Sequence, residues 1–192
     1  MNRTQLEHII RAAGDIANVK EIIVLGSQAI LGQFPKLSQP LLHIKEVEIS
    51  VRQQSQQTLC MSCEADVMIL GDEEKAELIE AVIGELSPFH ETFGYYAQTV
   101  DETTAMLPNG WQERLIPICN ENTNGITGYC LEIHDLIISK LNAGREKDFY
   151  FFKAAINLHI LSEEILINRL NNTPLPANSK TRLKHIIERF LQ

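Results

Sequence analysis

The chain has 192 residues, of which 44% are hydrophobic and 22% are charged, a composition typical of a globular protein with a proper core. The net charge of −8 at pH 7 argues against a broad basic face that grips nucleic acid, although a local basic patch is compatible with it. Because no apolar run is long enough to span a bilayer and the first residues lack the layout of a signal peptide, we expect a cytoplasmic protein without a membrane partner.

The first predicted elements are an amphipathic helix and a short buried strand. Thr4 is the expected cap of the helix, whose apolar residues share one face: Leu6, Ile9, Ile10, Ala13 and Ile16. The strand covers Lys20–Leu25, and Gly26 and Ser27 separate it from apolar residues at helical spacing. Glycine carries no Cβ and a helix N-terminus offers unpaired N–H groups, so this turn suits a phosphate beside Ser27. The alternative is an ordinary strand-to-helix turn.

Two further strands are expected after a passage rich in proline and glutamine. The first covers Leu41–Val51, where the later residues alternate between apolar and polar types. The second covers Leu59–Leu70, and the polar segment Arg52–Thr58 is the predicted connector. The two strands would form a hairpin.

The next elements are a helix and two extended segments. Residues 72–86 have an acidic first turn and apolar residues at helical spacing, which predicts a buried helix. The aromatic segment Phe89–Val100 is predicted to be extended, and Arg114–Ile118 is predicted to be a strand. Gly125 and Gly128 indicate a loop.

Nearly everything from Leu131 onward is predicted to be helical. The expected helices cover Leu131–Ala143 and Glu146–Leu161, with a break near Gly144 and smaller helices up to Gln192. We therefore expect two parts: an α/β core over residues 1–128 and a helical region over residues 129–192.

The four cysteines are interpreted as unpaired thiols. Cys60 and Cys63 form a C-x-x-C pair, but Cys119 and Cys130 are too widely spaced for the second tight pair that closes a structural zinc site. A cytoplasmic location also disfavours disulfides.

A metal-binding site is predicted where two acidic residues share one face of a strand. Glu64 and Asp66 are separated by one residue, so both side chains point to the same side. Like charges at this spacing repel and raise each other's pKa unless a divalent cation lies between them, which suggests magnesium. A solvated strand face that carries two acids is the alternative, and Glu46 and Glu48 form a second candidate metal pair.

The order of strand, Gly-Ser turn, helix and acid-x-acid strand resembles the DNA polymerase β type nucleotidyltransferase superfamily. Segments 64–100, 107–118 and 131–152 are similar to bacterial nucleotidyltransferase-like proteins related to the AbiEii-type toxins. That group shares a pattern of an aspartate, then a lysine, then a basic run that ends in aspartate. The matching residues here are Asp135, Lys140, Arg145 and Asp148. The resemblance implies a minimal nucleotidyltransferase core: an α/β (α+β) fold with a mixed, partly antiparallel sheet flanked by helices and a helical C-terminal part.

The resemblance also implies a role for each matched residue. Gly26 and Ser27 would hold the terminal phosphates of a nucleoside triphosphate, which we expect to be ATP. Glu64 and Asp66 would bind Mg²⁺ and act as the catalytic acids. Lys140 and Arg145 would bind the nucleotide, and Asp148 would be either a catalytic base or a structural anchor. The third carboxylate of polymerase-like sites is not evident, and Glu113 is the one candidate that precedes a predicted strand.

The function implied is transfer of a nucleoside monophosphate from a triphosphate to an RNA acceptor, such as tRNA, or to a protein acceptor. Within the toxin group the chain would be the toxin of a toxin–antitoxin system, with an antitoxin protein as its partner. One alternative is a degenerate nucleotidyltransferase that binds nucleotide or a partner without turnover. Another is an interaction module whose acidic residues belong to the solvated surface.

Overall fold

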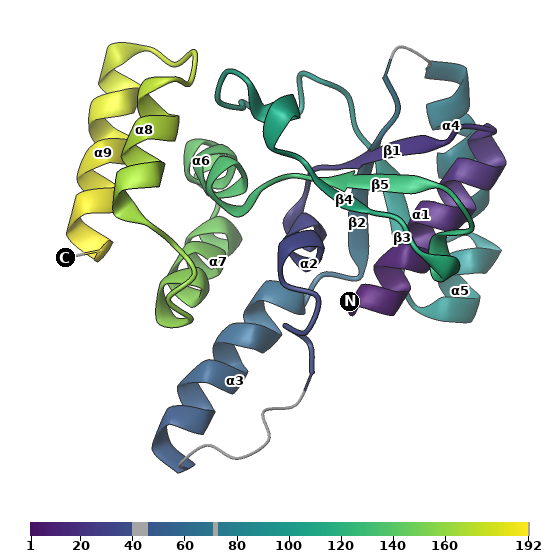
Figure 1. Cartoon of the computed structure of the whole chain (residues 1–192), viewed down its shortest axis with the longest axis horizontal. Coiled ribbons are helices and arrows are strands. Elements are labelled where there is room, and N and C mark those ends of the chain that lie inside the picture. The colour runs from purple at the N-terminus through teal and green to yellow at the C-terminus, as the bar shows by residue number, and fades with distance from the viewer. Residues whose placement is uncertain (40–45, 71–72, 192) are drawn as a thin grey trace.

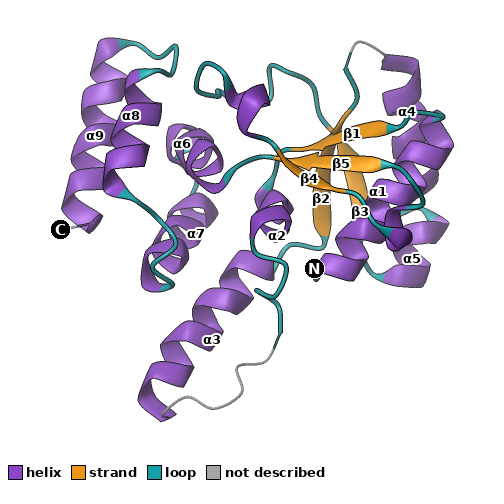
Figure 2. Ribbon diagram, in the orientation of Figure 1, coloured by secondary structure: helices purple, strands orange, loops and turns teal. Residues whose placement is uncertain are grey.

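The protein folds as a five-stranded mixed sheet flanked by helices, with further helices at its C-terminal end (Figures 1 and 2). The computed structural model describes residues 1–39, 46–70 and 73–191. The strands lie in the order β3-β2-β1-β5-β4 and are β1 (Glu21–Val24), β2 (Glu64–Met68), β3 (Tyr96–Thr99), β4 (Ile116–Ile118) and β5 (Thr127–Cys130). This architecture confirms the predicted fold class.

Helices surround the sheet and form the whole C-terminal part of the described chain. Figure 1 shows α8 and α9 at the opposite end of the molecule from α1, α4 and α5, with α6 and α7 between them. None of the helices within the described ranges is both long and apolar enough to cross a membrane. Their bounds are α1 (Arg3–Ala17), α2 (Ile30–Gln33), α3 (Glu46–Cys60), α4 (Glu73–Ile83), α5 (Pro88–Phe93), α6 (Ile133–Ala143), α7 (Glu146–Asn157), α8 (Glu163–Asn171) and α9 (Ala177–Leu191).

The pairing of β1 with β2 decides which residues meet at the edge of the sheet. The two strands run antiparallel, with Ile23 opposite Met68 and Val24 opposite Val67, so the residues that follow β1 lie beside the start of β2. The Leu25 amide continues this pairing by donating to the Asp66 carbonyl at 3.0 Å. Strand β5 pairs with β1 in parallel, and β3 pairs with β2 in parallel. The mixed sheet therefore combines both kinds of ladder, as predicted.

Helix α1 confirms the predicted amphipathic helix but begins at a different cap. Leu6, Ile9, Ile10 and Ala13 are fully buried. The Asn2 side chain accepts a hydrogen bond from the Gln5 amide at 2.9 Å, and the Gln5 side chain accepts one from the Asn2 amide at 2.8 Å. This reciprocal pair satisfies two of the free amides at the helix start. Thr4 lies inside the first turn, so the prediction of a Thr4 cap was wrong.

Helix α3 replaces the predicted hairpin. Residues 41–45 of the predicted first strand lie outside the described residues, and the rest of that strand and its connector form one continuous helix, Glu46–Cys60. The alternating residue types at Val47, Ile49 and Val51 resemble a strand pattern. However, α3 packs along α7, and such tertiary contacts override a local β preference. Of the predicted Leu59–Leu70 strand, only Glu64–Met68 is extended.

Three smaller predictions also need correction. Helix α4 is present, but it is amphipathic rather than buried, because Leu78 and Val82 are about half exposed. The first part of the predicted extended segment Phe89–Val100 is helix α5, whose first turn is capped where the Ser87 hydroxyl accepts from the His90 amide. Helix α7 ends at Asn157, four residues before the predicted end at Leu161.

Gly128 lies in strand β5 and not in the predicted loop. A Cβ atom at this position would come within 2.3 Å of the Ile10 side chain, so the glycine lets α1 pack directly on the sheet. The loop signal at Gly125 is confirmed, since this residue has a positive φ of 74°. The predicted boundary between residues 128 and 129 falls inside β5, a strand that pairs on both sides.

Asp135 connects the C-terminal helices to the rest of the fold. It lies in the first turn of α6 and has no exposed surface. Arg114 donates to its two carboxylate oxygens from Nε at 2.8 Å and from Nη2 at 3.1 Å. Arg169 of α8 places Nε 3.1 Å from Oδ1. One buried carboxylate thus neutralises two arginines from separate elements.

We predict that Asp135→Ala lowers the free energy of unfolding by about 3 kcal/mol, because it leaves two partly buried guanidinium groups without their counter-charge. Urea denaturation of the purified variants measures this. Glu188→Ala, which removes an exposed partner of Lys184, is the matched control and is expected to cost below about 0.5 kcal/mol. Equal costs for the two variants would contradict a connecting role for Asp135.

Candidate functional site

The turn after β1 is shaped by the absence of a side chain at Gly26. An ideal Cβ on Gly26 would lie 1.4 Å from Oδ2 of Asp66, so no other residue fits unless the carboxylate moves. Ser27 then begins a short 3₁₀ turn, Ser27–Ala29, which leads into α2. The predicted order of strand, Gly-Ser turn and helix is therefore confirmed, and β2 adds a carboxylate in contact with the turn.

Glu64 and Asp66 form a pair of neighbouring acids on one face of β2. Both side chains are partly buried, while Ala65 and Val67 between and beside them face the core. Burial, together with the charge and hydrogen bond of Glu64, raises the pKa of the Asp66 carboxyl to about 6, against the opposing charges of Lys140 and Lys147. The Tyr96 hydroxyl donates to Oε2 of Glu64 at 3.3 Å.

Lys140 brings a buried positive charge to the same turn. It lies in the last turn of α6, and its Nζ donates to the Ser27 hydroxyl at 2.8 Å and to Oδ1 of Asp148 at 3.3 Å. The ammonium group also lies 4.6 Å from the centre of the Phe151 ring. Burial lowers the pKa of Lys140, and the charge of Asp148 opposes this shift.

Asp148 makes the contacts of an anchor. It has no exposed surface, and its oxygens accept from Lys140 Nζ, from Arg145 Nε at 2.8 Å and from Arg145 Nη2 at 3.3 Å. It also accepts from the Arg145 amide, which caps α7. Burial alone would raise the pKa of Asp148, but the hydrogen bonds and charges of Arg145 and Lys140 lower it below its usual value. Of its two predicted roles, this geometry favours the anchor over the base.

One cavity of about 500 Å³ collects these groups. Six of the seven residues predicted as site residues line it, and Asp148 lies behind its wall. The cavity also includes groups that sequence reasoning missed: Tyr96 from β3 and Lys147, Tyr150 and Phe151 from α7. The spacing i, i+3, i+4 of the α7 residues could have indicated a shared face next to Arg145. The predicted residues on the cavity wall are Gly26, Ser27, Glu64, Asp66, Lys140 and Arg145.

The other candidate acids do not lie on strands. Glu46 and Glu48 lie in helix α3, so the strand geometry that made them a candidate metal pair is absent. Glu113 is exposed in a 3₁₀ turn, Trp111–Arg114, and does not line the cavity. On β3 the neighbours of Glu64 and Asp66 are Tyr96 and Gln98, which are not acids. Within the described ranges, Glu64 and Asp66 are the only acids on the cavity wall.

The donor set at Glu64 and Asp66 fits a magnesium ion. Mg²⁺ takes oxygen ligands and is commonly held by one or two carboxylates together with water and substrate phosphates. The two acids share one face, and protonation relieves their repulsion in the same way that a cation would. No group of three or more His, Cys, Asp or Glu side chains suited to a metal occurs in the described parts of the chain. Cys63 and Cys119 are exposed, Cys60 is partly buried and Cys130 is buried.

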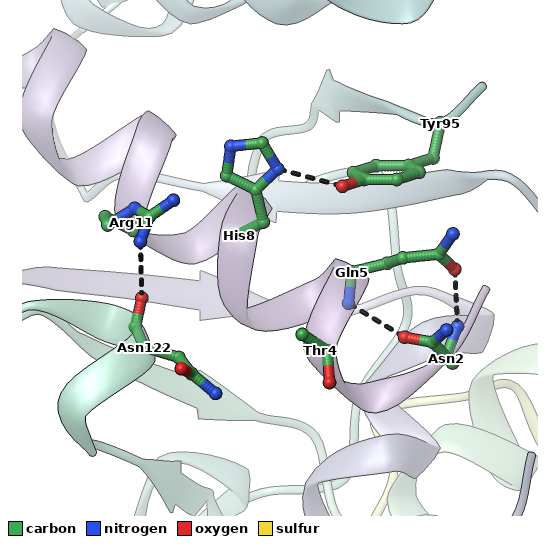
Figure 3. Close-up of a pocket in the computed structure, with 7 residues that line it drawn as sticks. All are labelled: Asn2, Thr4, Gln5, His8, Arg11, Tyr95 and Asn122. Carbon is green, nitrogen blue, oxygen red and sulfur yellow. Dashed lines mark hydrogen bonds between the residues drawn. The ribbon is translucent and has the colours of Figure 1, made fainter. Parts of the chain in front are cut away.

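A second hollow, of about 270 Å³, lies along α1 and lacks these features. Figure 3 shows that its side chains bind one another: the Tyr95 hydroxyl and His8 Nδ1 are 2.8 Å apart, and Arg11 donates to the Asn122 carbonyl at 3.3 Å. None of the described residues on its wall is an acid. Among the described residues, the acid pair and the buried lysine line the cavity of about 500 Å³ and not this hollow.

Comparison with known proteins gives one family match. A family model described as a nucleotidyltransferase of unknown function (DUF6036) matches residues 4–188, which is nearly the whole chain. No curated protein and no solved structure matches the chain.

The first prediction from this site concerns the contact between Gly26 and Asp66. Gly26→Ala is expected to cost roughly 1–3 kcal/mol of unfolding free energy, because the new methyl group displaces the carboxylate. In an Asp66→Ala background the same substitution should cost clearly less, since the clashing oxygen is gone. Urea denaturation of the four proteins gives the coupling energy. Additive costs would show that the two residues do not compete for this space.

The second prediction concerns the pKa of Asp66. Because this pKa is higher in the folded protein than in the unfolded chain, the stability that the proton confers is complete below about pH 4 and is lost as the pH rises through about 6. Asp66→Asn should therefore stabilise the metal-free protein by on the order of 1 kcal/mol at pH 8, and this gain should disappear at pH 4. Denaturation in chelator at both pH values checks it, with Glu113→Gln as the exposed control. A gain that does not change with pH would be the contrary result.

Proposed function

The chain belongs to this family of nucleotidyltransferases, and from that premise we propose that it transfers a nucleoside monophosphate from a triphosphate, with ATP as the expected donor, to an RNA or protein acceptor. The observation that carries the proposal is the meeting of three groups in one cavity: the Gly26-Ser27 turn, the Glu64 and Asp66 pair, and Lys140. A turn without a side chain at Gly26, a buried ammonium group and two acids that can hold a metal ion together suit a triphosphate better than an uncharged ligand.

Ser27 and Lys140 supply the phosphate contacts in this proposal. The Lys140 ammonium already donates to the Ser27 hydroxyl, so both groups can face the same phosphate oxygens. Because Lys140 is buried, its charge acts in a medium where water screens it poorly. Arg145 and Lys147 are more exposed and would neutralise the remaining phosphate charge at the mouth of the cavity.

Glu64 and Asp66 are the residues that would hold Mg²⁺. When bound there, the ion would supply the positive charge that a triphosphate needs during in-line displacement. Asp66 must lose its proton to serve as a ligand, and a pKa of about 6 leaves it mostly ionised at neutral pH. Tyr96 holds the other acid through its hydrogen bond to Glu64.

The proposed transfer forms a bond from the acceptor hydroxyl oxygen to the α-phosphorus and breaks the bond from that phosphorus to pyrophosphate. The hydroxyl proton passes to water. Asp148 acts as a positioning residue, because its oxygens are already committed to Lys140 and Arg145. The resemblance to toxins extends the proposal: an intracellular toxin would act in the cytoplasm and pair with an antitoxin protein.

The second candidate is a nucleotide-binding protein without turnover. One observation favours it: within the described ranges, the cavity wall carries two acids where polymerase-like sites use three, with Tyr96 and Gln98 beside them on β3. This candidate uses the same cavity and the same ligand, so it differs only in the absence of transfer.

The test incubates the protein with Mg²⁺ and each α-³²P-labelled nucleoside triphosphate, with tRNA, total RNA or cell protein as acceptors. We expect label transfer that is lost in Asp66→Asn and falls by roughly 10²–10³ in Lys140→Met, which removes a donor to the phosphates. Glu113→Gln, outside the cavity, should retain wild-type transfer. Binding of ATP without any transfer would favour the second candidate. If the protein neither binds ATP nor transfers label, both candidate functions are wrong.

A further inference from the structure

Two exposed side chains with apolar surface line the cavity beside its charged groups. Met61 is 77% exposed and Tyr150 is 54% exposed, and both line this cavity. Met61 follows the end of α3, whereas Tyr150 lies on α7, and these two helices pack against each other. The exposed apolar pair therefore lies on the walls of the cavity that also holds the acids and cations.

Helix α7 places this aromatic ring next to the positive charges. Lys147, Tyr150 and Phe151 are spaced at i, i+3 and i+4, so they share the face of α7 that lines the cavity. Phe151 is buried beneath the Lys140 ammonium, while Tyr150 lies farther out. The Tyr150 hydroxyl donates to Oε1 of Glu146 at 3.0 Å, which ties the ring to its own helix. An oriented aromatic ring thus lies one helical turn from Lys147.

We propose that Tyr150 and Met61 form the subsite for the nucleobase, with the base stacked on the Tyr150 ring. This inference rests on the proposed function and names the part of the ligand that the mouth of the cavity receives. A ligand that matches the whole cavity has an anionic end for Ser27, Lys140 and Lys147 and a planar, poorly solvated end for the aromatic wall. A nucleotide has both ends, and stacking removes the exposed ring of Tyr150 from water.

This subsite has a consequence for base selectivity. Stacking uses the π-face that all bases share, and it discriminates weakly between them. The Thr58 and Ser62 hydroxyls also line the cavity, but they are already bonded to the backbone: Thr58 donates to the Gln54 carbonyl at 2.8 Å, and Ser62 accepts from the Glu64 amide at 3.1 Å. The four common nucleoside triphosphates should therefore bind with dissociation constants within roughly tenfold of one another.

The experiment measures the binding of the Mg²⁺ complexes of the four nucleoside triphosphates, ATP included, and of Mg²⁺-tripolyphosphate, which has no base, by isothermal titration calorimetry. Tyr150→Ala should weaken ATP binding by roughly 5- to 100-fold and leave tripolyphosphate binding unchanged. Tyr150→Phe keeps the ring and should restore ATP binding to within about twofold of wild type. Met61→Ala should weaken ATP binding in the same selective manner, by a smaller factor. Phe93→Ala, an exposed aromatic residue on α5 outside the cavity, is the matched control.

Each outcome separates this inference from the proposed function. Wild-type binding of both ligands with no effect of Tyr150→Ala on ATP would overturn the base subsite and leave the phosphate site standing. Equal weakening of both ligands would also overturn it, because a purely structural role of Tyr150 predicts that result. Wild-type protein that binds neither ligand would remove the proposed function, and the subsite with it. A preference for one base far above tenfold would contradict recognition by stacking.

Discussion

The contact between the bare Gly26 backbone and the Asp66 carboxylate is the constraint on which the site depends. The turn that suits a phosphate follows β1, and the acid pair begins β2, so the two groups meet only because the strands run antiparallel. Even then, the carboxylate occupies the space that any side chain at position 26 would need. A glycine here therefore has a steric reason that is separate from backbone freedom, since its φ of −72° is accessible to every residue.

The buried charges around the cavity form two balanced groups. Asp148 neutralises Lys140 and Arg145 from behind the wall, which compensates for the cost of removing an ammonium group from water. Within the described residues no ion pair joins Glu64 or Asp66 to a cation, and burial together with repulsion from Glu64 raises the pKa of Asp66. The positive charges of Lys140 and Arg145 are therefore already neutralised by Asp148. The negative charges of the acid pair would still be stabilised by a bound cation. A metal-bound anionic substrate fits this arrangement, because its metal ion would lie at the acids and its negative charge near the cations.

The parts of the fold that could be predicted from sequence are those encoded by contiguous residues. The buried run before Gly26 and the regular apolar spacing before Gly144 gave β1 and α6 close to their observed bounds. Helix α3 was missed, because its alternating first residues mimic a strand and its partner α7 lies about a hundred residues away in the sequence. For the same reason Tyr150 and Tyr96 were not recognised as part of the site: only the packing of α7 and the pairing of β3 with β2 bring them to the cavity. Helix α3 supplies 15 of the residues between Gly26 and Glu64.

The packing of α3 on α7 determines how the cavity opens to its surroundings. Met61, directly after α3, and Tyr150, on α7, border the entrance, and these two helices pack against each other. Helix packing of this kind has few alternative arrangements, unlike a surface loop. A small ligand would then diffuse in through an opening whose width changes little. The positive charges of Lys147 and Arg145 at this opening would attract an anionic ligand, and this attraction would weaken as ionic strength rises.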